Sequence, residues 1–476
     1  MKTLNFVRYA FITAAVGLFA TSSDAAWTYT ETEVVNGTGK GSITDGVWTF
    51  YAERAKNSKN LSVKANQGSS TATEPCVIDF TTIGGDEIDG VEGEYKVVSF
   101  HQFSSQHGEY QSANRGSMLY SKRGLVSKFI APCCTQISGE GCFKGCTNLI
   151  EVSLGESVKI GSGRAFENCT SLRIFNTSDI DGDNKHGMPI ATFMNCSSLE
   201  GTLNFSECVS FAQDVFNGCA KLGGIKAENA ISVGQSSFAG CSSLSNIVLS
   251  SSVKSVGNSA FQGCSKITTE FVQGILHKGL EQLGNSATNR KYCFQNCTGL
   301  TGSLVWNLPN LITNAVPDYC FSGCTSLERV EIKSPVSVIG PSAFFNLKKG
   351  AEVYLPNEPI SVYESHAVAS DGVPFPRVYI GGDINSHLAK MYVSANNLIK
   401  KDEFNDTTWK SVLSGQSTAT WSAINKKMIN DETMCSKVDG KVVVKDRNVV
   451  AFIMGNTNYG CWILKKPETG FKVIVR

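Results

Sequence analysis

The chain has 476 residues, of which 41% are hydrophobic and 18% are charged, and its formal net charge at pH 7 is +1. This composition is ordinary for a folded protein, and the length allows two to four domains or one long repeat structure with flanking pieces. The near-zero charge argues against proteins that bind nucleic acids or anionic membranes through a basic surface.

The first 25 residues are predicted to be a secretory signal. Lys2 and Arg8 supply a positive start, the apolar stretch at residues 11–20 is too short to span a bilayer, and small residues around Ala25 suit cleavage. Beyond this segment the sequence has no apolar run of about 20 residues. We therefore expect an exported protein, secreted or held at the cell surface, without a transmembrane helix.

Residues 26–124 are expected to form a β-rich N-terminal cap. Short β-type runs at residues 47–51, 76–80 and 96–100 are separated by Gly, Ser and Asn. A repeat structure needs such a cap because its open end would otherwise expose apolar side chains to water. The stretch 95–103 is a candidate for a degenerate first repeat.

The middle of the chain repeats one short phrase, Phe-x-x-Cys-x-x-Leu. A degenerate ninth copy begins at Phe344, and eight full copies begin at Phe143, Phe166, Phe193, Phe216, Phe238, Phe261, Phe294 and Phe321. Their cysteines are Cys146, Cys169, Cys196, Cys219, Cys241, Cys264, Cys297 and Cys324. The phenylalanines lie 22 to 33 residues apart, which predicts a solenoid in which each repeat is one coil stacked on the last.

A second phrase lies between the phenylalanines. Leu244, Ile247 and Leu249 are followed by Val256 and Gly257, and the same spacing recurs from residue 327 on. The Leu-x-x-Ile-x-Leu part predicts a short strand whose alternate side chains point inward, and the Gly and Ser that follow it supply turns. Each Phe is then expected to fill the coil from the opposite side.

This pattern resembles the BspA-like branch of the leucine-rich repeat family, whose consensus joins Leu-x-x-Ile-x-Ile to Ile-Gly-x-x-Ala-Phe-x-x-Cys. The resemblance covers residues 130 to about 355 and departs from the consensus in the 33-residue interval after Phe261 and at Leu347, where a Cys is expected. It implies a right-handed solenoid of about nine to eleven coils over residues 125–395. A parallel β-sheet would line one face, with short helical or 3-10 turns on the other. It also implies a microbial surface or secreted binding protein, often an adhesin.

The pattern changes in the longest interval and again near the C-terminus. Residues 272–283 look helical, residues 377–380 and 391–393 are read as further strands, and residues 396–476 are assigned to a closing helix and a small β-rich module. Within that module we expect strands at residues 441–444, 449–454, 461–465 and 471–475.

The repeat cysteines are expected to stack inside the solenoid as buried, unpaired thiols. One thiol per coil cannot build a tetrahedral site, so no metal site is predicted. Cys435 and Cys461 lie outside the repeats, and a disulfide between them is left open. Asp179 and Asp181 imitate the start of a calcium loop, but Asn184 stands where such loops have Gly, which favours an acidic surface loop.

No catalytic motif emerges, so the chain is predicted not to be an enzyme and to use no cofactor. The predicted function is to present the outward positions of the parallel sheet to an extracellular protein or glycan. In the clearest strands these positions are Glu151, Ser153, Ser245, Asn246, Val248, Glu328, Arg329 and Glu331. Two alternatives stay open: a structural cell-surface component without a soluble ligand, and a carbohydrate-active accessory protein with a site in the cap or tail.

Overall fold

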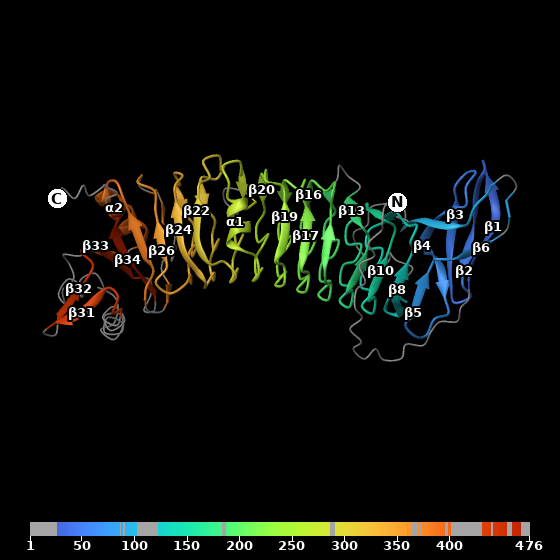
Figure 1. Cartoon of the computed structure of the whole chain (residues 1–476), viewed down its shortest axis with the longest axis horizontal. Coiled ribbons are helices and arrows are strands. Elements are labelled where there is room, and N and C mark those ends of the chain that lie inside the picture. Colours follow the sequence, from blue (N-terminus) through green and yellow to red (C-terminus); the bar gives the residue numbers. More distant parts are fainter. Residues whose placement is uncertain are drawn as a thin grey trace, which may run out of the picture.

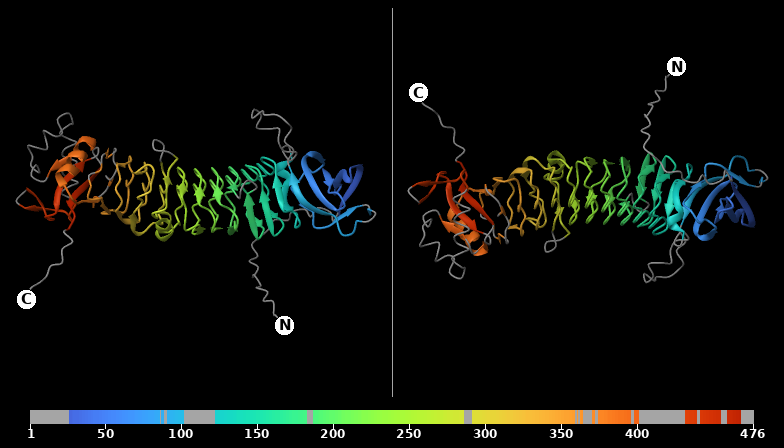
Figure 2. Two further views of the ribbon diagram at one scale, coloured as in Figure 1. Left: turned by 90° about the horizontal axis from the view of Figure 1, so that it is seen from above. Right: turned by 90° about the horizontal axis from the view of Figure 1, so that it is seen from below.

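The computed structural model describes residues 26–85, 87–88, 91–101, 122–182, 187–285, 291–358, 360, 362–363, 370–371, 374–395, 398–400, 431–438, 441–454 and 459–467. The predicted leucine-rich repeat solenoid is confirmed: the coils follow one another along one long axis, with the N-terminal strands at one end and the C-terminal strands at the other (Figures 1 and 2). The predicted secretory signal at residues 1–25 lies outside the described residues.

The Leu-x-x-Ile-x-Leu phrases form the first row of strands, which pair in parallel from coil to coil in three sheets. These strands are β5 (Cys76–Asp79), β8 (Val126–Ile130), β10 (Glu151–Ser153) and β12 (Ile174–Asn176); β15 (Thr202–Asn204), β17 (Gly224–Ala227) and β19 (Asn246–Leu249); and β22 (Gly302–Trp306), β24 (Leu327–Ile332), β26 (Glu352–Tyr354) and β29 (Arg377–Ile380). Their middle residues, such as Val152, Ile225 and Val330, are buried.

A second row of parallel strands follows in each coil, where we had expected turns except at residues 96–100, read as a β-type run, and at residues 272–283, read as helical. It consists of β7 (Lys96–His101), β9 (Gln136–Ser138), β11 (Ser157–Ile160) and β13 (Asp179–Gly182); β14 (Gly187–Met188), β16 (Ser210–Phe211), β18 (Ser232–Val233), β20 (Ser255–Val256) and β21 (Gln282–Leu283); and β23 (Ala315–Val316), β25 (Val338–Ile339) and β27 (Val362–Tyr363). Most of these strands are two residues long, too short to show an alternating pattern in the sequence.

The Phe-x-x-Cys turns close each coil, and their rings stack along the solenoid. Phe143 and Phe166 have centroids 5.1 Å apart and planes 3° apart, and the stack runs from Phe100 to Phe344. The backbone N–H of Phe166 donates to the carbonyl of Thr192 in the next coil at 2.8 Å. Each turn is therefore bonded to the next by backbone as well as by ring contact.

The residue two positions after each Phe takes a positive φ, as at Asn168 (62°), Asn195 (61°) and Gly218 (80°). Gly adopts this left-handed conformation without a Cβ clash, and Asn tolerates it better than most residues do. This backbone requirement explains why Gly or Asn precedes the repeat cysteine.

Seven repeat cysteines, from Cys169 to Cys324, donate a thiol hydrogen bond to the coil before. The Sγ atom of Cys196 lies 3.1 Å from the carbonyl oxygen of Phe166, and the seven distances run from 3.0 to 3.3 Å. All the repeat cysteines are buried and free. Cys435 and Cys461 are also free, so the disulfide left open between them is not formed.

The N-terminal end is closed by an antiparallel meander of β1 (Trp27–Val35), β2 (Thr38–Thr44), β3 (Trp48–Arg54) and β4 (Asn60–Ser70), with β6 (Ile83–Gly85) beside β1. Strand β4 pairs in parallel with β7, so the meander continues the second row. Two strands that we had assigned to the cap, β5 and β7, pair in parallel with β8 and β9 of the solenoid.

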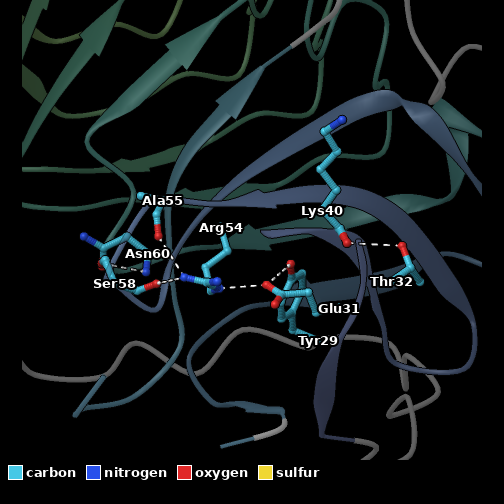
Figure 3. Close-up of polar contacts among 8 residues, drawn as sticks. All are labelled: Tyr29, Glu31, Thr32, Lys40, Arg54, Ala55, Ser58 and Asn60. Carbon is cyan, nitrogen blue, oxygen red and sulfur yellow. Dashed lines mark hydrogen bonds and ion pairs between the residues drawn. The ribbon is translucent and has the colours of Figure 1, made fainter. Parts of the chain in front are cut away.

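A buried arginine ties the strands of this meander together. Arg54 Nε donates to the Glu31 carboxylate at 2.8 Å, and Nη1 donates to the carbonyls of Ala55 and Ser58 at 3.0 and 3.2 Å (Figure 3). The Tyr29 hydroxyl donates to the same carboxylate at 3.4 Å. The charge of Arg54, only 4% exposed, is thereby matched by a carboxylate and two carbonyls.

At the C-terminal end the residues that we had assigned to a separate module extend the first row. Strand β34 (Tyr459–Lys465) pairs in parallel with β29 and so adds one strand to the row. It pairs antiparallel with β33 (Val449–Met454) and with β28 (Ser370–Asp371). Strand β33 in turn pairs antiparallel with β30 (Leu398–Lys400). A hairpin of β31 (Cys435–Val438) and β32 (Lys441–Val444) forms its own sheet. The strand expected at residues 471–475 lies outside the described residues.

The strand expected at residues 391–393 is wrong, because these residues belong to helix α2 (Ile384–Ala395). Asp383 begins the helix: its carboxylate accepts the backbone N–H of Ser386 at 3.2 Å, as an N-cap does. Leu388 and Met391, one turn apart, are both buried, so a helical face produced the pattern that we took for a strand. Neither α1 nor α2, nor any other helix in the described part of the chain, is long and apolar enough for a membrane span.

Helix α1 (Thr269–Ile275) lies in the longest interval, where the first row is interrupted between β19 and β22. The side-chain amide of Gln273 donates to the carbonyl of Val305 at 3.0 Å and accepts its N–H at 2.8 Å. The hydroxyl of Thr269 pairs in the same two ways with Thr301, at 2.6 and 2.8 Å. These side chains satisfy backbone groups of β22 that a neighbouring strand would otherwise pair.

Replacing Gln273 by Leu should expose this sheet edge. We expect faster amide hydrogen exchange at Val305 and a free energy of unfolding lower by about 1 kcal/mol, because the half-buried N–H and C=O of Val305 lose their partner. Hydrogen-exchange mass spectrometry measures the first effect and urea unfolding the second. Gln262→Leu is the control, since the side chain of Gln262 bonds to the side chain of Gln295 and not to the backbone of β22. Equal exchange at Val305 in both variants would refute the role of Gln273.

The thiols should make the protein unstable in alkali. Burial raises the pKa of the seven bonded repeat thiols, that of Cys324 to about 12. In the unfolded chain the thiols ionise above a pH of about 8.5, whereas in the folded chain they stay protonated to a higher pH. Their contribution to the free energy of unfolding is therefore fully present below that pH. It falls as the pH rises toward the folded pKa, by about 1.4 kcal/mol per thiol and pH unit.

Urea unfolding of the wild type and of Cys241→Ala between pH 8 and pH 10 checks this dependence. The variant should be less stable at pH 8, yet its stability should fall less steeply with pH, since one buried thiol is gone. Cys133→Ala, which removes a half-buried thiol, is the control. Identical slopes for Cys241→Ala and the wild type would contradict the explanation.

Candidate functional site

The candidate binding residues all lie along the first row, which Figure 1 shows following the long axis, but in three different sheets. Glu151 and Ser153 are on β10, Ser245, Asn246 and Val248 are at β19, and Glu328, Arg329 and Glu331 are on β24. Strands β12, β15 and β17 separate the first group from the second, and α1 and β22 separate the second from the third. The structure therefore does not bring the three groups together.

The first two groups have the features of a solvated sheet surface. The Glu151 carboxylate pairs with Lys128 at 2.9 Å and accepts from the Ser153 hydroxyl at 3.2 Å, and Asn176 donates to that hydroxyl at 3.0 Å. Val248 is 39% exposed without a comparable cluster of partners around it. The polar groups on β10 are thus satisfied by their own neighbours.

Arg329 and Glu331 of the third group belong to a denser cluster on β24, β26 and β29, which we name the tyrosine–arginine patch. Its members are Arg329, Glu331, Glu352, Tyr354, Arg377 and Tyr379, all half-buried. The parallel register places Arg329, Glu352 and Arg377 side by side, and Glu331, Tyr354 and Tyr379 beside them. Because successive strand residues point to opposite faces, the buried valines between them leave these side chains outward.

The patch is held in one arrangement by stacking and hydrogen bonds. The rings of Tyr354 and Tyr379 stack with centroids 4.3 Å apart and planes 9° apart, and the Arg329 guanidinium carbon lies 3.9 Å from the Tyr354 centroid. Glu352 accepts one bond from each tyrosine hydroxyl, both at 3.2 Å. Arg377 Nη1 lies 3.9 Å from the same carboxylate. A ligand would therefore meet side chains that are already ordered.

The charges of the patch follow from these contacts. Burial, and then the charge of Glu352, raise the pKa of Tyr354 and of Tyr379, so both hydroxyls keep their protons at neutral pH. The Nε atom of Arg377 is buried and has no hydrogen-bond partner among the described residues. The patch thus offers aromatic edges and arginine donors on a rigid sheet.

Sequence reasoning found Arg329 and Glu331 but missed the other four residues. A usable signal was present: a charged residue, Val, Tyr and an aliphatic residue occur in that order at residues 352–355 and again at residues 377–380. This alternation predicts two strands with a charge and a tyrosine on the outward side. The strand at residues 377–380 was predicted, but its outward side chains and the matching strand at residues 352–354 were not, because the Phe-x-x-Cys phrase is lost in this region.

The calcium-loop candidate and the cap have other contacts. Asp179 accepts bonds from the backbone N–H and the hydroxyl of Ser206, at 2.7 and 2.5 Å, while Asn184 of the supposed calcium loop lies outside the described residues. Across the described part of the chain, no group of three or more His, Cys, Asp or Glu side chains is arranged to hold a metal ion. In the cap, the Glu31 carboxylate is engaged by Arg54.

Comparison with known proteins matches the repeat region to a family model. The model of the BspA type leucine rich repeat region matches in six copies, over residues 116–231, 185–289 and 280–371, which together span more than half of the chain. No curated protein matches.

Several solved structures are similar to this chain. A leucine-rich cell surface protein from Faecalibacterium prausnitzii A2-165 is 16% identical, with a TM-score of 0.37 over 72% of this chain and 96% of that one. A leucine-rich repeat protein from Bacteroides ovatus ATCC 8483 is 17% identical, with a TM-score of 0.31 over 71% and 91%. The pneumococcal vaccine antigen PcpA is 14% identical, with a TM-score of 0.30 over 69% and 94%. Likenesses this distant say nothing about ligands.

Glu352 should be the residue that orders the patch. In Glu352→Gln only one acceptor oxygen remains for two tyrosine hydroxyls, so we expect the free energy of unfolding to fall by about 1 kcal/mol. The pKa values of Tyr354 and Tyr379 should also fall, since a carboxylate charge no longer raises them. Urea unfolding and NMR titration of ring-labelled tyrosine measure the two effects.

Glu328→Gln is the matched control. The Glu328 carboxylate is 53% exposed and pairs with Lys348 at 2.6 Å, and exposed ion pairs contribute only about 0–1 kcal/mol. A loss of stability as large as that of Glu352→Gln, or unchanged tyrosine titration in Glu352→Gln, would show that Glu352 does not organise the patch.

Proposed function

Because this chain belongs to the BspA-type leucine-rich repeat family, we propose that it is an exported, adhesin-like binding protein. In this proposal the first row of strands presents a broad surface to an extracellular protein or glycan, and the tyrosine–arginine patch is where binding is strongest. The chain acts at the cell surface or after secretion, and it performs no catalysis.

The patch is the observation that supports this proposal. Tyrosine and arginine are enriched in the few interface residues that contribute most of the binding energy. Here two tyrosines and two arginines stand on three adjacent strands, ordered by Glu352 before any ligand arrives. The outward candidates on β10 and at β19 (Glu151, Ser153, Ser245, Asn246 and Val248) include no tyrosine and no arginine.

A non-catalytic role fits the chemistry of the same residues. Glu352 is the carboxylate at the centre of the patch, and both of its oxygens accept tyrosine hydroxyls. These bonds orient the two tyrosines, so Glu352 acts as a positioning group for the patch. The leader-like residues 1–25 support export.

Binding of the purified full-length mature chain to immobilised extracellular matrix proteins and glycans tests the proposal. We expect saturable binding, and in Tyr354→Ala/Tyr379→Ala a dissociation constant at least about tenfold higher, since hot-spot residues contribute about 2 kcal/mol or more. Lys226→Ala/Glu228→Ala is the control, because both side chains are exposed and lie outside the patch.

Three results would count against this proposal. Unchanged binding in the tyrosine variant would remove the patch from the interface. Ordered self-association without saturable binding would favour the structural cell-surface alternative. Glycan binding that is lost only on changing cap or tail residues would favour the carbohydrate-active alternative.

A further inference from the structure

We propose that Arg329 is the anion-binding group of the patch and that it takes an aspartate or glutamate side chain of a protein ligand. This inference rests on the proposed function and names the chemistry of the partner. It is drawn from how Arg329 is oriented, from what its neighbours already bind, and from the pattern of charge along the row.

The Arg329 guanidinium is held in place by an aromatic stack. Its central carbon lies 3.9 Å from the Tyr354 centroid, and Tyr354 in turn stacks on Tyr379. A guanidinium carbon this close to a ring centroid makes a cation–π contact, which uses the face of the ring and none of the N–H donors. The donors that suit a carboxylate therefore stay available on a half-buried side chain that the ring holds in place.

The carboxylates nearest to Arg329 already have other partners. Glu328 pairs with Lys348 at 2.6 Å, Glu331 lies 3.9 Å from Lys333, and Glu352 accepts from both tyrosines. Within the described residues, Arg329 forms no ion pair, and its guanidinium forms no hydrogen bond. The guanidinium contacts the ring of Tyr354. An anion from outside the chain would supply the missing partner.

A second arginine lies in the same row. The register places Glu352 between Arg329 and Arg377, so the two arginines are two strand spacings apart, about 9–10 Å. The buried Nε of Arg377 has no partner among the described residues. A carboxylate bound at Arg329 would thus also be attracted by the positive charge of Arg377.

The pattern of charge favours a protein ligand over a sulfated glycan. A sulfated chain needs a continuous run of cations, whereas here lysines and glutamates alternate and pair, as Lys348 does with Glu328. The face of Tyr354 lies against the Arg329 guanidinium, and the register places Ser303 of β22 beside Arg329 and the half-buried Val305 beside Glu331. An acidic residue flanked by apolar residues would match both features.

An array of 12-residue peptides provides the probe. Each peptide carries a central Asp or Glu between apolar residues and is printed beside the same sequence with Asn or Gln; heparin is printed as the sulfated glycan. The full chain should bind a subset of acidic peptides at least tenfold more tightly than their amide partners. Arg329→Gln should abolish this preference, and Arg329→Lys should not restore it, because an ammonium group lacks the planar fork.

Arg173→Gln is the matched control, since Arg173 is 57% exposed near β12 and should leave the preference unchanged. Circular dichroism and urea unfolding confirm that each variant is folded. If Arg329→Gln keeps the acidic preference while Tyr354→Ala/Tyr379→Ala abolishes binding, the proposed function stands and the role of Arg329 is wrong. Binding to heparin and to no peptide overturns the partner class, and binding to neither peptides nor matrix proteins overturns both proposals.

Discussion

The bond between each Phe carbonyl and the cysteines around it is the constraint on which the solenoid depends. The carbonyl of Phe166 accepts the backbone N–H of Cys169 within its own coil and the thiol of Cys196 from the next coil, both at 3.1 Å. A carbonyl oxygen has two lone pairs, and both are used here. Ala would fill the space without donating, and the hydroxyl of Ser is more costly to bury, so a thiol meets both needs.

This constraint fixes the surface as well as the core. Since ring stacking and turn bonds hold successive coils in one register, outward residues at equal positions must stand side by side on neighbouring strands. Arg329, Glu352 and Arg377 are 48 residues apart from first to last, yet the register places them in one row. The patch is thus a consequence of coil spacing, and its rigidity is that of the stack beneath it.

The repeat was enough to predict the solenoid, because every coil needs a Phe and a Cys at the same positions to pack against the next coil. Features that depend on pairing between distant segments could not be predicted from the sequence. Nothing in residues 459–465 shows that β34 pairs with β29, about 80 residues earlier, and the two-residue strands of the second row carry no period. Four of the six patch residues were missed for a related reason, since side chains such as Tyr354 and Tyr379 become neighbours only through register.

The closing strands also explain why the patch lies where it does. Strand β34 places the buried Trp462 and Leu464 beside Arg377 and Tyr379. The buried carboxylate of Asp431 ties this end together, accepting from Trp462 Nε1 at 2.9 Å and from the backbone N–H of Phe375, just before β29, at 3.1 Å. An open last coil would leave Tyr379 at a fraying edge. By continuing the sheet past β29, residues far along the chain make its outermost tyrosine an interior position, as rigid as the rest of the row.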